Sequence, residues 1–122
     1  MISFNLMILA AGYGKRMNNL TFKTPKPLLK INNKELIRHN IDFFQKLGCK
    51  KIVINTHYLH DQIKTCIEKY YVNKNIILTY EPTLLNTGGG IKNALSFFDG
   101  KNFLVTNADI LWREENLKDV SN

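Results

Sequence analysis

Residues 6–16 read LMILAAGYGKR, and this stretch decides the fold class of the 122-residue chain. It begins with a continuous apolar run, which is typical of a β-strand buried on both faces of a parallel sheet. The run ends at two alanines and a glycine-rich turn, where the chain becomes polar. We therefore predict a buried strand that delivers a glycine-rich turn to one edge of a sheet.

Three further runs of strand length follow, and they are rich in β-branched and aromatic residues. They lie at residues 51–55, 76–80 and 103–106. Between them, apolar side chains recur with the period of an α-helix, about 3.6 residues. These helical segments cover residues 35–47, 59–70 and 91–98, and the second places Tyr70 on its apolar face. Strands that alternate with helices predict an α/β fold, a Rossmann-like three-layer sandwich with a mainly parallel sheet.

The composition fits one domain and narrows the classes of partner. Lys and Arg number 17 against 10 Asp and Glu, a formal charge of +7 that favours an acidic partner. The lysines are scattered singly, as on a solvated surface, and no nucleic-acid-binding motif is present, so we expect no nucleic-acid partner. No apolar segment approaches the roughly 20 residues that span a bilayer, and we expect no membrane partner. Cys49 and Cys66 lack metal-ligand spacing, which favours packed thiols and a cytoplasmic location.

Polar or glycine-rich segments follow each predicted strand. They are residues 11–16, 56–58, 81–82 and 107–109. In a parallel sheet the carboxyl ends of the strands meet at one edge, and ligands bind beyond that edge. We therefore expect these segments to form the ligand site.

Two segments of the chain suit phosphate, the turn after the first strand and a lysine between two prolines. Gly12 and Gly14 can present backbone N–H groups to an anion, although their spacing matches neither the dinucleotide fingerprint nor the phosphate loop, and a simple tight turn is the alternative. Lys26 lies between Pro25 and Pro27, which restrict the backbone and aim the lysine rigidly. The alternative for Lys26 is a turn with a solvated lysine.

Taken together, residues 9–17 (LAAGYGKRM) and 25–29 (PKPLL) resemble the signature of the sugar-1-phosphate nucleotidyltransferases. The resemblance continues through residues 53–59, 85–91 and 104–109. The sequences of these motifs are closest to those of the N-acetylmuramate-1-phosphate uridylyltransferases, and the mannose-1-phosphate and heptose-1-phosphate guanylyltransferases share much of them. The resemblance implies transfer of a nucleoside monophosphate from a nucleoside triphosphate to a sugar-1-phosphate, with release of pyrophosphate. UTP with N-acetylmuramate-1-phosphate is the first expectation for the substrates, and guanylyl transfer is the alternative.

The resemblance also implies a role for each site residue. Arg16 would neutralise the β- and γ-phosphates, Lys26 would lie near the α-phosphate, and Asp109 would hold Mg²⁺, although a helix N-cap is the alternative for Asp109. These three are the expected catalytic residues, with Mg²⁺ as cofactor. His57 is interpreted as structural. The expected nucleotide-binding residues are Ala10, Ala11, Gly12, Gly14, Lys15, Arg16, Lys26, Glu81, Thr87, Gly88, Gly89 and Asn107.

Length is the main departure from the family pattern. Members usually continue about as far again beyond the aspartate that corresponds to Asp109, and that part supplies the sugar pocket and a second carboxylate for Mg²⁺. We therefore expect residues 1–122 to form the nucleotide-binding part of a fold that is truncated relative to the full nucleotidyltransferase. A second polypeptide or a homo-oligomer would complete the site. The alternative is a catalytically inactive remnant that still binds nucleotide.

Overall fold

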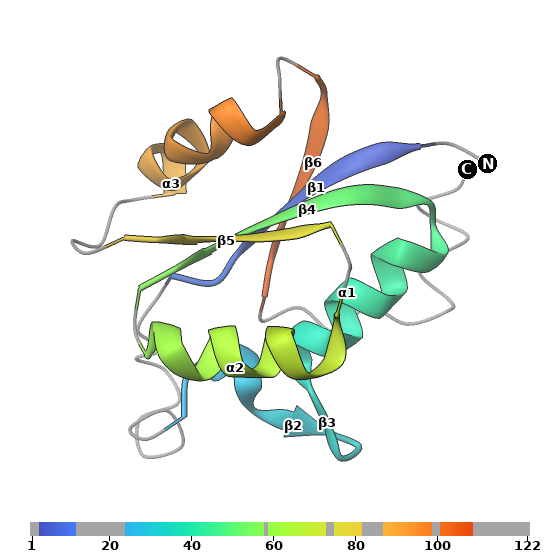
Figure 1. Cartoon of the computed structure of the whole chain (residues 1–122), viewed down its shortest axis with the longest axis vertical. Coiled ribbons are helices and arrows are strands. Elements are labelled where there is room, and N and C mark those ends of the chain that lie inside the picture. Colours follow the sequence, from blue (N-terminus) through green and yellow to red (C-terminus); the bar gives the residue numbers. More distant parts are fainter. Residues whose placement is uncertain are drawn as a thin grey trace.

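The computed structural model describes residues 3–11, 24–57, 59–72, 75–81, 87–98 and 101–108. Its centre is a four-stranded sheet in the order β5-β4-β1-β6 (Figure 1). The strands are β1 (Phe4–Leu9), β4 (Cys49–Thr56), β5 (Ile76–Tyr80) and β6 (Phe103–Asn107). Every pairing between neighbours is parallel, which confirms the predicted α/β class with a parallel sheet.

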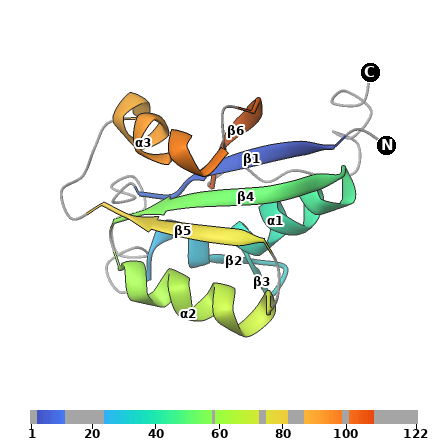
Figure 2. The ribbon, with the colours of Figure 1, turned by 45° about the horizontal axis from the view of Figure 1, so that its top comes forward.

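The order of the strands reverses beside β1. The chain moves outward from β1 to β4 and β5, then returns to the other side of β1 as β6. Helices α1 (Leu36–Lys46) and α2 (His60–Tyr70) cover one face of the sheet, while α3 (Thr87–Ala94) and the 3-10 turn η3 (Leu95–Phe98) cover the other (Figure 2). Such a reversal opens a crevice beyond the carboxyl ends of the two strands that flank it, here β1 and β6.

Two apolar cores sandwich the sheet because successive strand side chains point to opposite faces. Leu6 and Ile8 of β1 belong to the larger core, which lies under α1 and α2. Met7, between them, joins the smaller core with Ala94 and Phe98 under α3 and η3. This confirms the double-sided burial that the continuous apolar run predicts.

The structure corrects the prediction for one residue of the second helix. Its bounds agree closely with the predicted segment, but Tyr70 is exposed, and Tyr71, just past the helix end, is the buried tyrosine. The Arg38 guanidinium lies 3.5 Å from the centre of the Tyr70 ring. Tyr70 therefore carries a cation–π contact at the surface instead of filling the core.

The third helix begins earlier than predicted. Thr87 and the three glycines, which precede the predicted helical segment at residues 91–98, form the first turn of α3. Glycine is unfavourable in helices by about 1 kcal/mol per residue, so propensity argued against this start. Close packing is the reason: a Cβ on Gly90 would lie 2.7 Å from Asn55 Nδ2, and only glycine allows the helix to approach so closely.

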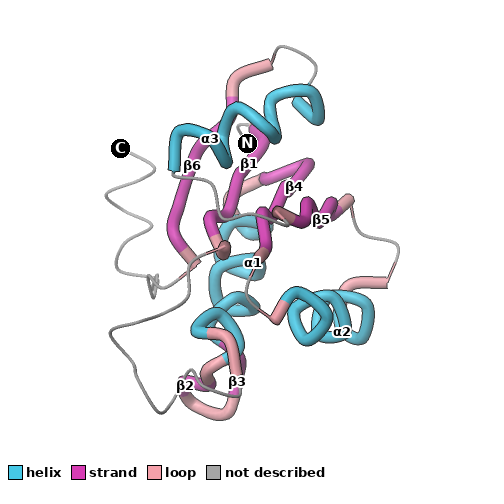
Figure 3. Tube along the Cα trace, turned by 90° about the vertical axis from the view of Figure 1, so that its left-hand side faces the viewer, coloured by secondary structure: helices cyan, strands magenta, loops and turns pink. Residues whose placement is uncertain are grey.

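A short hairpin that sequence analysis missed joins the first strand to the first helix. Strands β2 (Lys30–Ile31) and β3 (Lys34–Glu35) pair antiparallel around Asn32 and Asn33, whose φ values are 55° and 63°. Positive φ at both central positions defines the hairpin turn that asparagine tolerates. The hairpin lies near one end of α1 and far from α3 (Figure 3).

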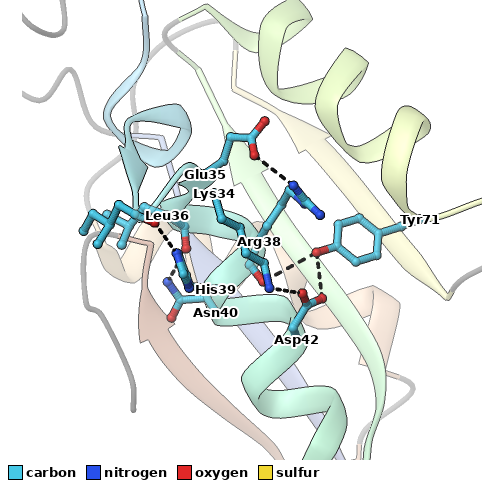
Figure 4. A network of polar contacts seen from close by, with 9 residues as sticks. Lys34, Glu35, Leu36, Arg38, His39, Asn40, Asp42 and Tyr71 are labelled. Atoms are coloured by element: carbon cyan, nitrogen blue, oxygen red, sulfur yellow. Dashed lines mark hydrogen bonds and ion pairs between the residues drawn. The ribbon is translucent and has the colours of Figure 1, made fainter.

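Polar contacts fasten the hairpin to the helical layer (Figure 4). Lys34 forms an ion pair with Asp42 of α1, and the Tyr71 hydroxyl donates to Asp42 Oδ1 at 2.9 Å. Arg38 donates from Nη1 to Glu35 Oε1 at 3.1 Å. These contacts connect β3, α1 and the end of α2 on the side of the molecule away from α3.

Candidate functional site

The residues that follow β1 and β6 lie side by side. Leu9 is in register with Asn107, and the Ala108 N–H donates to the Leu9 carbonyl at 3.0 Å. Ala10 and Ala11 are buried at this edge, while Asn107 is exposed. The fold therefore brings three predicted nucleotide-binding residues to the crevice where the strand order reverses.

Asn55, at the carboxyl end of β4, connects this point to the neighbouring strands. Its side chain is buried, and its Oδ1 accepts a hydrogen bond from the Ala10 N–H at 2.8 Å. Its Nδ2 donates to Glu81 Oε1 at 3.0 Å. Because Glu81 directly follows β5, one amide joins the ends of three parallel strands.

Glu81 is 2% exposed, so its carboxylate faces the protein interior. Its N–H donates to the Thr56 carbonyl at 2.7 Å, which continues the pairing of β4 and β5 past the strand end. His57 Nδ1 contacts the Glu81 carbonyl oxygen. This contact with the backbone supports the structural interpretation of His57.

The first turn of α3 lies against the Asn55 and Glu81 pair. A Cβ on Gly90 would lie 3.0 Å from Glu81 Oε1, besides its approach to Asn55. Gly90 is buried, Gly89 is partly buried and Gly88 is exposed. The first turn of α3 therefore contains three glycines, and Gly90 packs directly against the side chains that join β4 to β1 and β5.

Lys26 begins the 3-10 turn η2 (Lys26–Leu28) and is partly buried. Pro25 and Pro27 on either side of it are buried, and the Leu28 N–H donates to the Pro25 carbonyl at 2.9 Å. The turn packs against α1 and α2. The backbone of Lys26 is thus held rigidly, as the two prolines predict.

Asn40 is a site residue that sequence reasoning missed. It is fully buried in α1, and its Nδ2 donates to the Leu36 carbonyl at 3.2 Å and to the Ala108 carbonyl at 3.3 Å. Ala108 immediately precedes Asp109, so Asn40 anchors the segment that leads into the expected metal ligand. The available signal was a lone polar residue on the apolar face of a predicted helix.

Several predicted site residues lie outside the described residues. They are Gly12, Gly14, Lys15, Arg16 and Asp109, together with the side chain of Thr87. Within the described ranges, no group of three His, Cys, Asp or Glu side chains could hold a metal ion. Nor does any described helix have the length and apolar character to cross a membrane.

Both cysteines are free, and burial raises the pKa of each thiol to about 11. Cys66 also donates weakly to Glu35 Oε2 at 3.8 Å. Thiols with raised pKa values stay protonated near neutral pH and react poorly. This confirms the expectation of ordinary packed thiols.

A parallel sheet whose strand order reverses beside β1, with helices on both faces (Figure 2), defines an α/β protein of the doubly wound class. The chain belongs to the nucleotidyl transferase family, whose sequence profile matches residues 5–121.

Among similar proteins, the N-acetylmuramate alpha-1-phosphate uridylyltransferase of Neisseria meningitidis is 43% identical over 107 residues, covering 86% of this chain and 46% of the relative. The D-glycero-alpha-D-manno-heptose 1-phosphate guanylyltransferase of Aneurinibacillus thermoaerophilus is 31% identical over 106 residues, covering 87% of this chain and 46% of the relative. The crystal structure of HddC from Yersinia pseudotuberculosis complexed with GMP-PN superposes with a TM-score of 0.82 at 28% identity, covering 97% of this chain and 53% of that one. The chain thus spans about half the length of these relatives.

Proposed function

We propose that residues 1–122 form the nucleotide-binding part of a sugar-1-phosphate nucleotidyltransferase. Its reaction would transfer a nucleoside monophosphate from a nucleoside triphosphate to a sugar-1-phosphate and release pyrophosphate. The observation that carries the proposal is the reversal of strand order between β1 and β6, where Leu9 is in register with Asn107 and is followed directly by Ala10 and Ala11. Family membership supports the same reaction class.

The proposed roles follow from the chemistry of phosphoryl transfer, which depends on positioning and on neutralising charge. Arg16, Lys15 and the amides of Gly12 and Gly14 would bind the β- and γ-phosphates. Lys26 would stabilise charge at the α-phosphate during the attack by the sugar phosphate.

The nucleobase would lie against the backbone of two segments that are rich in small residues. One is Ala10 and Ala11 after β1, and the other is the first turn of α3 with Thr87, Gly88 and Gly89. Asn107 would border the same crevice. The proximity of the two segments, joined through Asn55, supports this assignment.

Mg²⁺ fits the chemistry of this edge, and Asp109 is the residue that we propose to hold it. Asp109 follows Ala108, whose carbonyl is anchored by Asn40. Mg²⁺ commonly takes one or two protein carboxylates plus substrate phosphates, and this is the mode that we propose for Asp109. When bound, the ion supplies positive charge to the triphosphate oxygens.

A further polypeptide segment, continuous with this chain or separate, would complete the enzyme. Among the described strands β6 pairs only with β1, and Leu104 and Val105 of β6 are 46% and 42% exposed. An edge strand with exposed apolar side chains is suited to pairing with another strand. We propose that this edge receives the part that supplies the sugar pocket and a second carboxylate, from a second polypeptide or a second copy.

For substrates, we propose UTP and N-acetylmuramate-1-phosphate in the cytoplasm, for NDP-sugar biosynthesis that serves the cell envelope. The relative with 43% identity supports this choice through its printed activity. Guanylyl transfer to heptose-1-phosphate or mannose-1-phosphate is the second candidate, favoured by the likeness to HddC complexed with GMP-PN.

Pyrophosphate release tests the proposal, with UTP and GTP each paired with the candidate sugar phosphates. The chain is assayed alone and together with the separately expressed second half of a relative. We expect turnover in the complemented sample, and a loss of about 100-fold in Lys26→Ala or Asp109→Ala. Lys64→Ala, at an exposed lysine on α2, is the matched control. Triphosphate binding by calorimetry without pyrophosphate release in any sample would instead select the inactive remnant.

A further inference from the structure

We propose that Asn55 is a positioning residue that couples the two backbone segments expected to hold the nucleobase. These segments are Ala10 after β1 and the first turn of α3. The inference rests on the proposed function for its consequence in nucleotide binding. The coupling itself rests on hydrogen bonds and close contacts among described residues.

The partners of Asn55 determine which end of its amide faces which neighbour. The Ala10 N–H can only donate, so the amide oxygen faces it at 2.8 Å. The Glu81 carboxylate accepts, so the amide nitrogen faces it at 3.0 Å. A side chain at this position must therefore accept on one side and donate on the other, at the length of asparagine.

Other side chains fail this requirement for identifiable reasons. Leucine has a similar shape but leaves the Ala10 N–H and the Glu81 carboxylate without this partner in a buried place. Aspartate accepts from Ala10 but presents a second carboxylate to Glu81. Because Asn55 and Glu81 are 5% and 2% exposed, solvent cannot readily replace the lost partner.

The same amide sets the position of α3. Gly90 approaches Asn55 Nδ2 so closely that an added Cβ would lie 2.7 Å away, and the Glu81 oxygen would lie at 3.0 Å. A movement of the Asn55 side chain would therefore change its contacts with the first turn of α3 and with Ala10 at the same time. Because the Glu81 N–H is bonded to the Thr56 carbonyl, Glu81 cannot easily follow such a movement.

A ligand that binds both segments gains affinity when they are already correctly spaced. Without the Asn55 amide, the segments would need to be ordered at the moment of binding. We expect this loss to appear as weaker nucleotide binding with an unchanged stoichiometry.

Asn55→Asp is the informative variant because one added proton can restore the missing donor. Near pH 8 the two carboxylates repel each other, and we expect triphosphate affinity at least 10-fold weaker than in the unchanged chain. Near pH 5 protonation of the introduced aspartate recreates a donor toward Glu81, and we expect most of the affinity to return.

The triphosphate affinity of the unchanged chain is measured at both pH values, as a control for any effect of pH on the nearby histidines. His57 contacts the Glu81 carbonyl, and His60 contacts Thr56. Asn102→Asp is the matched control, because Asn102 is exposed at the amino end of β6. Equal affinity of Asn55→Asp and the unchanged chain at pH 8 would overturn the proposal.

A double-mutant cycle tests the contact with α3. Gly90→Ala should weaken triphosphate binding about 10-fold, because its Cβ displaces Asn55. In an Asn55→Ala background the same substitution should cost far less, since the crowded amide is gone. Additive effects of the two substitutions would contradict the coupling.

Amide hydrogen exchange by NMR separates failure of the coupling from failure of the proposed function. In Asn55→Leu, which removes the acceptor for the Ala10 N–H, that N–H and the amides of the first turn of α3 should exchange at least 10-fold faster, while those of Leu6 and Ile8 in β1 should not change. If exchange is faster in this way but the unchanged chain does not bind triphosphate, the proposed function is rejected and the coupling stands. Unchanged exchange at Ala10 would reject the coupling whether or not nucleotide binds.

Discussion

The carboxyl edge of the sheet and the outer surface around the hairpin are both held by polar side chains, in different surroundings. At the edge, Asn55, Glu81 and Asn40 are buried and bond to backbone or to one another. Around the hairpin, Lys34 and Asp42 form an ion pair with each other, and their side chains are 31% and 36% exposed. Buried polar groups lose much when a partner is removed, whereas exposed ion pairs are partly replaced by water. The edge is therefore the part whose geometry is specified by polar contacts.

The largest effect is expected at Asn55. Asn55→Leu leaves a backbone N–H and a carboxylate without this partner, so we expect the free energy of unfolding to fall by about 2–3 kcal/mol. Urea unfolding followed by circular dichroism measures the change. A loss no greater than that of Lys34→Ala would remove the distinction between the two regions.

A smaller loss is expected from the same substitution at Asn40. Asn40→Leu removes the 3.3 Å bond to the Ala108 carbonyl and the 3.2 Å bond to the Leu36 carbonyl in its own helix, both of which are neutral, whereas Asn55 bonds to a carboxylate. We expect a decrease of about 1–2 kcal/mol in the same urea experiment. If Asn40→Leu proved more damaging than Asn55→Leu, the bond to a carboxylate would not explain the cost.

The two cysteines, one at the start of β4 and one in α2, predict a dependence of stability on pH. Burial raises the pKa of Cys49 and Cys66 to about 11, above the ordinary value of 9.0. Unfolded thiols ionise first, so this contribution to stability is present below pH 9 and is lost as the pH rises from about 9 to about 11. Unfolding curves between these pH values should fall less steeply in the Cys49→Ala, Cys66→Ala double variant, and parallel curves would contradict the assignment.

The smallest effect is expected at the hairpin. Lys34→Ala breaks an exposed ion pair, and we expect a change below about 0.5 kcal/mol that shrinks further at high salt. Urea unfolding at low and high salt provides the measurement. A decrease of more than about 1 kcal/mol in the free energy of unfolding would show that polar contacts at this surface stabilise the fold about as much as those at the edge.

Much of the fold could be predicted because it depends on local patterns. The run at Ile76–Tyr80 has the predicted bounds, and the helices α1 and α2 differ from prediction by a single residue at their ends. The early start of α3 was not predictable, because three glycines oppose a helix locally and the close packing of Gly90 against Asn55 is a tertiary contact. The hairpin was missed although Asn32 and Asn33 carry its turn signal.

The candidate site divides in the same way. The rigid turn at Lys26 follows from two neighbouring prolines, so the sequence reveals it directly. The roles of Asn40 and Asn55 do not follow from their neighbours in the chain. Asn55 meets Ala10 and Glu81, which are 45 and 26 residues away, and Asn40 meets Ala108, which is 68 residues away.

The sequence by itself determined the α/β class, the glycine-rich and proline-bounded segments and the family resemblance. Hydrophobic periodicity and short motifs are properties of adjacent residues, which is why they can be recognised without coordinates. Only the tertiary structure decided the strand order, the crevice between β1 and β6 and the choice of Asn55 as the link between Ala10 and α3. The physical reason is that a buried amide is specified by the donors and acceptors around it, and folding alone brings those together.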